Sequence, residues 1–376
     1  MDDYKIIKLL TNLKDETVFY GTVSNINKKD NDYYVNIDLF NNVTKELDCF
    51  IINNNIKDFT YTFELCIETF NLTILGYKNE LLKFEIVDDE TRAYNVYDGI
   101  IWFNINKNFD EVNPFKYKKM NFKVEKASSN CKEKYMELID YHKKDLQKKM
   151  IIEKKLDINI TNKNHIKNPN VYYSQYHVGL GNCSYINIDG LTRGFFNIGF
   201  SNLLKGKSFP YYGFSRHKPD WIIISNLNIN NYRAAIRYGD EKIFSSDWIM
   251  PYSLKLNVNI IRLFYGILNN DGKIYMLKYK ANSSVFSLIA NNVKIKMYFT
   301  SESEIGLCLY VEKDDKFISL GNSDYNFMTK SLIPQKFDIL VLPSIESKMK
   351  TKVSLNKTGG FRVYRTDNKG TFKCKL

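Results

Sequence analysis

The hydrophobic pattern is sharpest in the second half of the chain, where an apolar run meets a polar one. Residues 221–224 read Trp-Ile-Ile-Ile, which is typical of a strand buried on both faces. The run stops at residues 225–231, where Ser and Asn dominate, and a segment with helical character follows. This order predicts a buried strand, a polar loop and then a helix.

Short runs with strand character recur in the first hundred residues. They cover residues 17–23, 33–39 and 81–87, and turn-rich stretches such as residues 25–32 separate them. Several strands at this spacing predict a small β-barrel or sandwich. An OB-like barrel is one candidate, and such barrels often bind single strands. The acidic balance of this region favours a packing or partner-docking role instead.

Residues 128–156 carry the period of an amphipathic helix, which Ser128 or Ser129 can cap. The stripe consists of Tyr135, Leu138, Ile139, His142 and Leu146. On this stripe, His142 is expected to pack and not to bind a metal. The polar run at residues 159–169 is typical of a linker, and Pro169 marks the start of the last domain.

Composition and charge narrow the class of protein. The 376 residues are 44% apolar and 15% aromatic, which indicates globular, sheet-rich domains. Six scattered cysteines without a C-x-x-C pair favour reduced thiols in a cytoplasm. The N-terminus is not typical of a signal peptide, and no apolar stretch reaches the length of a membrane span, so neither is expected.

The net charge of +12 is unevenly distributed. Residues 1–100 hold 10 Lys and Arg against 18 Asp and Glu, whereas residues 166–376 hold 29 against 15. A basic surface attracts nucleic acid or another acidic partner, although a merely solvated Lys-rich surface explains the same counts.

Five segments from about residue 170 onward stand out by their glycines and strand-end polar residues: residues 177–184, 194–199, 225–231, 317–323 and 337–348. Together they resemble the metallo-β-lactamase-fold hydrolases, in particular compact bacterial members. Residues 225–231 match the family's metal loop, H-x-[HD]-x-D-H. The resemblance implies an αββα sandwich for residues 168–376. Together with the strands and the helix predicted above, this gives an α+β class with two further parts: a small β-rich domain (1–95) and a connecting region with a long amphipathic helix (96–167).

The resemblance also implies a metal site, but this chain departs from the family at every matched ligand position. These positions hold Asn226, Asn228, Asn230, Asn231, Asn322 and Ser344. Neutral amide and hydroxyl oxygens are weak zinc ligands, so no metal or other cofactor is expected. The Asn side chains are expected to hydrogen-bond each other and nearby backbone groups. A relocated site built from His177, Asp189 or His217 is the catalytic alternative.

Two binding functions are the alternatives to a hydrolase with a relocated metal site. In the first, a basic rim around the former active site binds a nucleic acid or a phosphate-bearing ligand. The residues expected on this rim are Arg233, Arg237, Lys348, Lys350 and Lys352. In the second, the chain is a regulatory or structural subunit that docks a protein partner through its N-terminal domain and helix. Similarity to compact bacterial relatives suggests a complex of the bacterial defence type.

Overall fold

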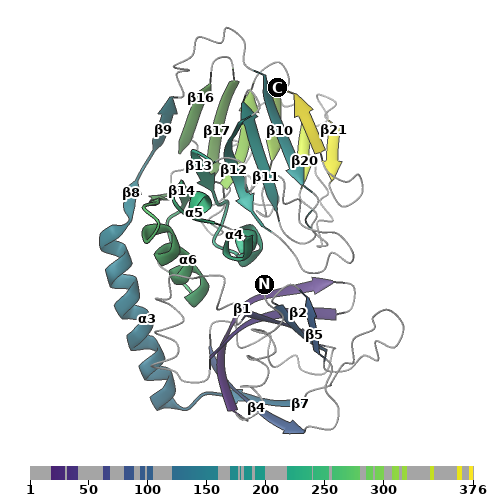
Figure 1. Ribbon diagram of the computed structural model, residues 1–376, viewed down its shortest axis with the longest axis vertical. Helices are drawn as coiled ribbons and strands as arrows, with labels where there is room; N and C mark the ends of the chain where they lie inside the picture. The colour runs from purple at the N-terminus through teal and green to yellow at the C-terminus, as the bar shows by residue number, and fades with distance from the viewer. Residues whose placement is uncertain are drawn as a thin grey trace. The chain divides into compact units, whose positions relative to one another are not determined.

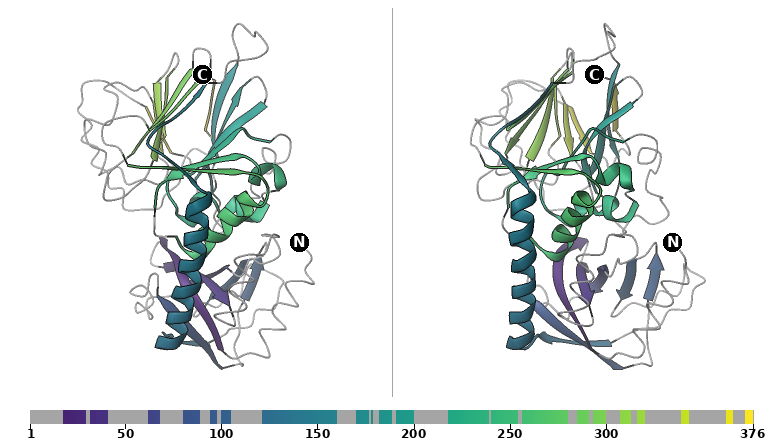
Figure 2. Two further views of the ribbon diagram at one scale, coloured as in Figure 1. Left: turned by 90° about the vertical axis from the view of Figure 1, so that its left-hand side faces the viewer. Right: turned by 60° about the vertical axis from the view of Figure 1, so that its left-hand side comes forward.

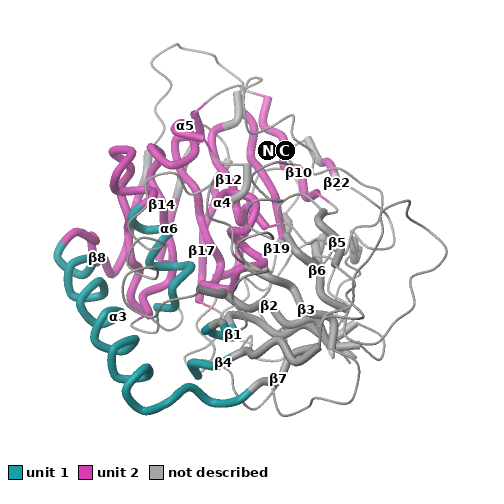
Figure 3. The backbone as a smooth tube through the Cα atoms, turned by 60° about the horizontal axis from the view of Figure 1, so that its bottom comes forward, with its two compact units in different colours: residues 1–148, 256–265 teal, residues 149–255, 266–376 magenta. Residues whose placement is uncertain are grey.

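The computed structural model shows two compact units, coloured in Figure 3. One contains residues 1–148 and 256–265, and the other contains residues 149–255 and 266–376. The structure describes residues 18–29, 32–40, 62–67, 80–88, 94–97, 100–104, 121–159, 170–176, 178, 182–188, 191–199, 218–238, 240–253, 256–279, 285–290, 293–299, 307–312, 316–319, 339–342, 362–365 and 372–375. The three-part domain division stays a prediction.

The first unit contains a seven-stranded sheet in the order β5-β6-β3-β2-β1-β4-β7. The strands are β1 (Val18–Lys29), β2 (Asp32–Phe40), β3 (Thr62–Ile67), β4 (Leu81–Asp88), β5 (Tyr94–Tyr97), β6 (Ile100–Asn104) and β7 (Asn121–Lys126). The three strands predicted from the sequence are confirmed as β1, β2 and β4. The predicted turn at residues 25–32 is wrong up to Lys29, because β1 continues there and pairs with β2 after a register shift. Cross-strand pairing thus overrides the weak strand propensity of Asn and Lys.

The predicted amphipathic helix is α3 (Ser129–Lys149), and it is shorter than the expected 128–156. Tyr135, Ile139, His142 and Leu146 are buried as predicted, whereas Leu138 is half-buried. His142 packs as expected: its Nδ1 lies 3.0 Å from the Tyr265 hydroxyl. That hydroxyl donates its hydrogen to Asp145 at 2.9 Å, so His142 Nδ1 must be the donor in the other contact.

The second unit contains two sheets. The eight-stranded sheet has the order β22-β10-β11-β12-β13-β14-β15-β8, and the seven-stranded sheet has the order β21-β20-β19-β18-β17-β16-β9. The first consists of β8 (Ile151–Glu153), β10 (Val171–Tyr176), β11 (Cys183–Ile188), β12 (Leu191–Ile198), β13 (Trp221–Ile223), β14 (Asp247–Pro251), β15 (Lys273–Leu277) and β22 (Phe372–Lys375). The second consists of β9 (Leu156–Asn159), β16 (Phe286–Ala290), β17 (Val293–Phe299), β18 (Leu307–Glu312), β19 (Lys316–Ser319), β20 (Ile339–Leu342) and β21 (Arg362–Arg365).

The two sheets of this unit face each other across one hydrophobic core (Figure 2). Tyr173, Trp221 and Ile249 from the eight-stranded sheet share this core with Phe286 and Leu309 from the seven-stranded sheet. The strand after residue 220 is fully buried, as its apolar run predicts. This unit is therefore a two-sheet sandwich with mixed parallel and antiparallel pairing.

Helices cover the outer face of the eight-stranded sheet (Figure 1). Ile249 points into the core, so its neighbour Trp248 points outward, and its indole N–H donates to the Ile243 carbonyl at 3.1 Å. Ile243 belongs to α5 (Glu241–Phe244). Another short helix, α4 (Arg233–Tyr238), contacts β12. The structure is thus mixed α and β, and a helix layer on the second sheet stays a prediction.

The remaining helix, α6 (Val258–Leu268), ends just before β15. The N–H of Gly272 donates to the Ile267 carbonyl at 2.9 Å, which closes the last turn. No helix in the described part of the chain is both long and apolar enough to cross a membrane.

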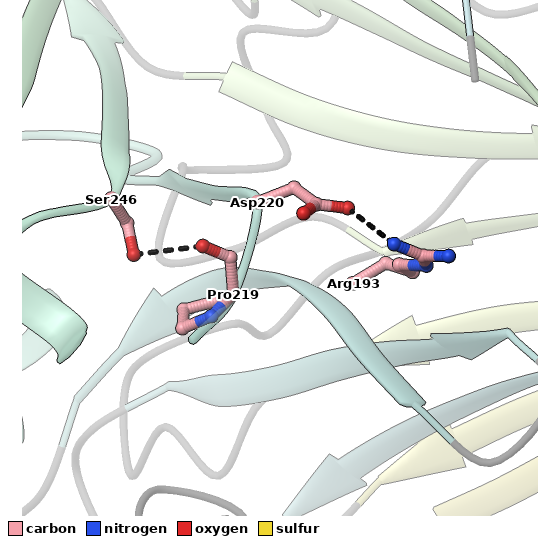
Figure 4. A network of polar contacts seen from close by, with 4 residues as sticks. All are labelled: Arg193, Pro219, Asp220 and Ser246. Atoms are coloured by element: carbon pink, nitrogen blue, oxygen red, sulfur yellow. Dashed lines mark hydrogen bonds and ion pairs between the residues drawn. The ribbon is translucent and has the colours of Figure 1, made fainter. Parts of the chain in front are cut away.

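Polar contacts join the amino ends of the parallel strands β12, β13 and β14 (Figure 4). Arg193 on β12 pairs with Asp220 at 3.1 Å, and the Ser246 hydroxyl donates to the Pro219 carbonyl at 2.8 Å. Burial raises the pKa of Asp247, the first residue of β14, and nearby Lys273 and Lys218 oppose this shift. These contacts lie at the end of the strands opposite to residues 225–231, which follow β13 directly.

Candidate ligand site at the carboxyl ends of the central strands

The Asn-rich loop, residues 225–231, contacts one end of each of the two sheets in the sandwich. Strands β12 and β13 are parallel, with Phe196 opposite Ile223, so their carboxyl ends lie side by side. The loop follows β13 directly. From the other sheet, the N–H of Leu307 at the start of β18 donates to the Ser225 carbonyl at 2.7 Å. The loop is therefore held between the two sheets.

Within the loop, the Asn side chains hydrogen-bond the loop itself. Asn226 Oδ1 accepts from the N–H of Asn228 at 3.1 Å. Asn228 Oδ1 accepts from the N–H of Asn230 at 3.0 Å and caps the 3₁₀ helix η4 (Ile229–Asn231). Ser, Asn and Asp favour such local bonds, which explains why the chain leaves the strand here.

The amide nitrogen of Asn231 is the centre of the loop. It donates to Asn226 Oδ1 at 2.5 Å, to Ser225 Oγ at 3.3 Å and to the Asn226 carbonyl at 3.3 Å. The side chain is fully buried. Three oxygens that face one point therefore surround an amide N–H₂ group, which supplies the positive end of a dipole.

Asn197 joins the loop to strand β12. The pairing of β11 with β12 shifts register here, because Cys183 lies opposite Ile198 while Ser184 lies opposite Phe196. Asn197 is the extra residue of this bulge, and its φ of 61° is a conformation that Asn tolerates better than most residues. Its Oδ1 accepts from the N–H of Ser225 at 2.7 Å.

Asn182 holds the other end of the loop. Its N–H donates to the Asn230 carbonyl at 3.3 Å, and its own carbonyl accepts from the N–H of Gly199 at 2.7 Å. A Cβ atom on Gly199 would overlap the Asn230 carbonyl and the Asn182 backbone. Only glycine fits this close approach of three backbone segments.

Behind Asn182 lies a second polar layer on β10. Gln175 Oε1 accepts from the Tyr173 hydroxyl at 2.7 Å, and Gln175 Nε2 donates to Asn182 Oδ1 and, at 3.5 Å, to the Cys183 carbonyl. All of these side chains are buried. Within the described residues, the amide nitrogens of Asn182 and Asn197 have no hydrogen-bond partner.

Nearby thiols are not set up for nucleophilic catalysis. Burial raises the pKa of Cys183 far above its ordinary value, and burial raises the pKa of Cys308 to about 12. Both thiols are therefore protonated at neutral pH, and a protonated thiol is a poor nucleophile.

Comparison with known proteins does not assign the chain to a family. No family profile matches it, and no curated protein matches it. Solved structures with some similarity include the metallo-β-lactamase fold protein YhfI from Bacillus subtilis, at 11% identity and a TM-score of 0.32, over 46% of this chain and 71% of that one.

Two further solved structures match at similarly low sequence identity and at lower TM-scores. The short form of human tRNase Z matches at 11% identity and a TM-score of 0.31, over 46% of this chain and 77% of that one. A Zn-dependent hydrolase assigned to the metallo-β-lactamase superfamily from Thermotoga maritima matches at 13% identity and a TM-score of 0.21, over 46% and 61%. We therefore base the architecture on the chain's own strand order and shared core.

The described residues do not fit the metal that the sequence resemblance implies. No three His, Cys, Asp or Glu side chains converge within the part of the chain that the structure describes. At the loop, the oxygens of Asn226 and Ser225 already accept from the Asn231 amide. A cation there would meet amide hydrogens, and no carboxylate occurs in residues 221–236 to offset its charge.

The structure brings together only some of the residues singled out in the sequence. Asn226, Asn228, Asn230 and Asn231 form the loop, and Arg233 follows it with a side chain only 4% exposed. The backbone of Arg237 lies in α4. The other candidates lie outside the described residues: His177, Asp189, His217, Asn322, Ser344, Lys348, Lys350 and Lys352.

Sequence reasoning gave no role to Gln175 or Asn182. Gln175 had a weak signal, since a large polar residue interrupts an otherwise sheet-like stretch of Val, Tyr and Ser. Asn182 follows the sequence Gly-Leu-Gly at residues 179–181, but its partners come from three separate segments, at Gln175, Gly199 and Asn230.

Proposed function

We propose that this protein acts by binding and not by metal-dependent hydrolysis. The loop at the carboxyl ends of β12 and β13 is the proposed site, and its ligand is a nucleic acid or another phosphate-bearing molecule. The observation that carries the proposal is the Asn231 amide, which donates to three oxygens of the same loop. Because an amide cannot activate water as a bound metal does, the loop has the frame of a catalytic site without its chemistry.

Charge supports an anionic ligand. Residues 166–376 hold 29 Lys and Arg against 15 Asp and Glu. The strand, loop and helix of residues 221–236 contain one charged residue, Arg233. An excess of positive charge attracts phosphate groups, and each phosphate that the protein neutralises releases counterions.

The test measures binding and cleavage in one sample. A fluorescent oligonucleotide, single-stranded or duplex, is titrated with protein at several salt concentrations, and the recovered nucleic acid is examined on a denaturing gel. We expect affinity to fall steeply with salt and the oligonucleotide to stay intact, with or without added Zn²⁺ or Mn²⁺. A peptide nucleic acid of the same base sequence is the control, since it lacks phosphates and is expected not to bind.

A second candidate function is docking of a protein partner through α3. This helix exposes the side chains of Tyr141 at 67% and Met136 at 43%, so both offer apolar surface to a partner. Residues 1–100 are acidic, so a basic partner is favoured. Co-purification with the wild-type chain but not with a Tyr141→Ser, Met136→Ser variant supports this function, whereas equal recovery with both argues against it.

A further inference from the structure

Two buried asparagines contact the two ends of the Asn-rich loop. For the side-chain N–H₂ group of each, the described residues supply no hydrogen-bond acceptor. Asn197 contacts Ser225 at the start of the loop, and Asn182 contacts Asn230 near its end. Each side chain is fully buried, and each Nδ2 atom lacks a partner within the described residues.

The orientation of each amide follows from its neighbours. The backbone N–H of Ser225 can only donate, so the atom of Asn197 that faces it must be the oxygen. The Cys183 carbonyl can only accept, so the atom of Gln175 that faces it must be nitrogen, and Asn182 turns its oxygen to that nitrogen. Flipping either asparagine would oppose donor to donor, so the two N–H₂ groups keep their positions.

Leaving such donors buried without an acceptor is costly, and folded proteins rarely do so. We propose that Asn182 and Asn197 together form a binding site for a small oxyanion, with phosphate as the ligand. This inference rests on the proposed function and narrows it, because it names the residues that hold the phosphate group. Amide N–H donors bind oxyanions in the same way when they stabilise developing negative charge in enzymes.

The local charge agrees with an oxyanion and disagrees with a cation. The residues that contact Asn182 and Asn197 are Gln175, Gly199, Ser225 and Asn230, and none of them is Asp or Glu. Arg233, which follows the loop, is the only charged residue in residues 221–236. Both Nδ2 atoms are shielded from solvent, so phosphate must enter through local opening of the Asn-rich loop, and ligand-binding loops commonly have low local stability.

The experiment uses the whole chain and inorganic phosphate. Thermal unfolding is followed over a series of phosphate concentrations, with sodium chloride at matched ionic strength as the reference. Binding to the folded state raises Tm with the logarithm of ligand concentration once the site fills. Sulfate tests the shared oxyanion chemistry, and acetate separates a carboxylate from a tetrahedral oxyanion.

Two variants remove the proposed donors and keep the acceptor oxygens: Asn182→Asp and Asn197→Asp. Asn187→Asp is the matched control, because it adds the same charge on β11 near the opposite end of the hairpin, opposite Thr192. We expect phosphate to stabilise the wild type and Asn187→Asp, and this effect to be lost in the other two variants. Equal stabilisation of all four proteins overturns the inference.

A second measurement does not depend on the folding of the variants. The side-chain N–H₂ resonances of Asn182 and Asn197 in the wild type, assigned by nuclear magnetic resonance, are expected to shift with phosphate and not with chloride. Absence of that shift, with no phosphate-dependent change in Tm, overturns the inference in favour of an ordered water molecule as the acceptor.

The oligonucleotide titration separates this inference from the proposed function. Salt-dependent oligonucleotide binding without any phosphate effect overturns the Asn182 and Asn197 site and leaves the binding function standing. A phosphate effect without oligonucleotide binding supports the site and restricts its ligand to small phosphates. If neither the oligonucleotide nor phosphate binds, both proposals are overturned.

Discussion

The side-chain oxygen of Asn197 accepts a hydrogen bond from the backbone N–H of Ser225 at 2.7 Å, and this contact joins the end of β12 to the loop after β13. Only an acceptor oxygen is needed there, and an amide supplies it as well as a carboxylate does. A neutral side chain therefore holds the loop in this geometry, and the contact itself requires neither a charged residue nor a metal ion.

Replacing Asn197 is expected to destabilise the protein in a graded manner. Asn197→Ala leaves the buried N–H of Ser225 without an acceptor, which costs about 1–3 kcal/mol, and it places Ala at a φ of 61°, which costs about 1 kcal/mol more. Asn197→Gly loses only the hydrogen bond, because glycine adopts this φ freely. Denaturant unfolding should rank the wild type above Gly and Gly above Ala. Equal free energies of unfolding for all three proteins would show that the hydrogen bond from Ser225 to Asn197 does not stabilise the fold.

Restoring one metal ligand is expected not to restore hydrolysis. In Asn226→His, an imidazole replaces the oxygen that accepts from Asn231 and from the N–H of Asn228. We expect a loss of about 1–3 kcal/mol in the free energy of unfolding and no phosphodiesterase or lactamase turnover. Asn322→Asp is the companion variant, because it restores a different single position. Measurable metal-dependent turnover in either protein contradicts this prediction.

The elements could be predicted from the sequence more fully than the contacts of the site. Trp221–Ile223 and the following Asn residues specify a strand and a loop through local polarity alone. The contacts of Gln175 and Asn182 depend on β10, the residues before β11 and Gly199 meeting in space, which local patterns do not encode. Likewise, β8 and β9 lie at the edges of the two sheets although they precede the predicted linker, because their partners are β15 and β16, more than 100 residues later.

Metal removal is expected to have no effect on stability. The described site offers amide and hydroxyl oxygens that are already hydrogen-bonded, so no metal-binding free energy should be coupled to folding. We expect purified protein to hold far less than one equivalent of zinc, manganese or iron by elemental analysis. Its Tm should be the same before and after treatment with a chelator. One equivalent of tightly held metal whose removal lowers Tm would show that the chain uses a relocated site.

The Asp247 carboxyl is expected to make stability fall as pH rises. Burial raises its pKa in the folded state, so the folded chain holds this proton more tightly than the unfolded chain. Stability from this group is full below the unfolded pKa, about 3.9, and is lost as pH rises through the raised folded pKa. Asn cannot ionise, so the Tm advantage of Asp247→Asn over the wild type should grow as pH rises above about 4 and level off once Asp247 is ionised in the folded state.

Asp220→Asn is the matched control for this effect. Asp220 lies at the same end of the sheet but pairs with Arg193, so its replacement removes an attractive contact at the surface. Its charge also makes the smallest of the contributions to the pKa of Asp247, after burial, Lys273 and Lys218, so the burial effect persists in this variant. We expect this variant to be equal to the wild type or less stable by up to about 1 kcal/mol at neutral pH. If both Asn variants change Tm in the same direction and with the same pH profile, burial of Asp247 is not the cause.

The last prediction concerns the three lysines that follow residues 343–347. Lys348, Lys350 and Lys352 lie outside the described residues, but they directly follow the strand end that the sequence resemblance places at the former metal site. Replacing all three by Ala should weaken oligonucleotide binding. For each phosphate group that the variant no longer binds, the slope of log Kobs against log salt should become shallower by about 0.7 to 0.9. Fluorescence anisotropy at several salt concentrations measures both quantities.

A second triple variant, Lys134→Ala, Lys144→Ala and Lys148→Ala, removes the same charge from exposed positions on α3. Because long-range attraction depends on net charge, both variants should lose some affinity at low salt, but only direct binding of phosphate groups changes the slope. We therefore expect the α3 variant to keep the wild-type slope. If the two variants have the same slope as the wild type, Lys348, Lys350 and Lys352 are merely solvated, and the docking function gains weight. If only the α3 variant becomes shallower, nucleic acid binds the helix and not the Asn-rich loop.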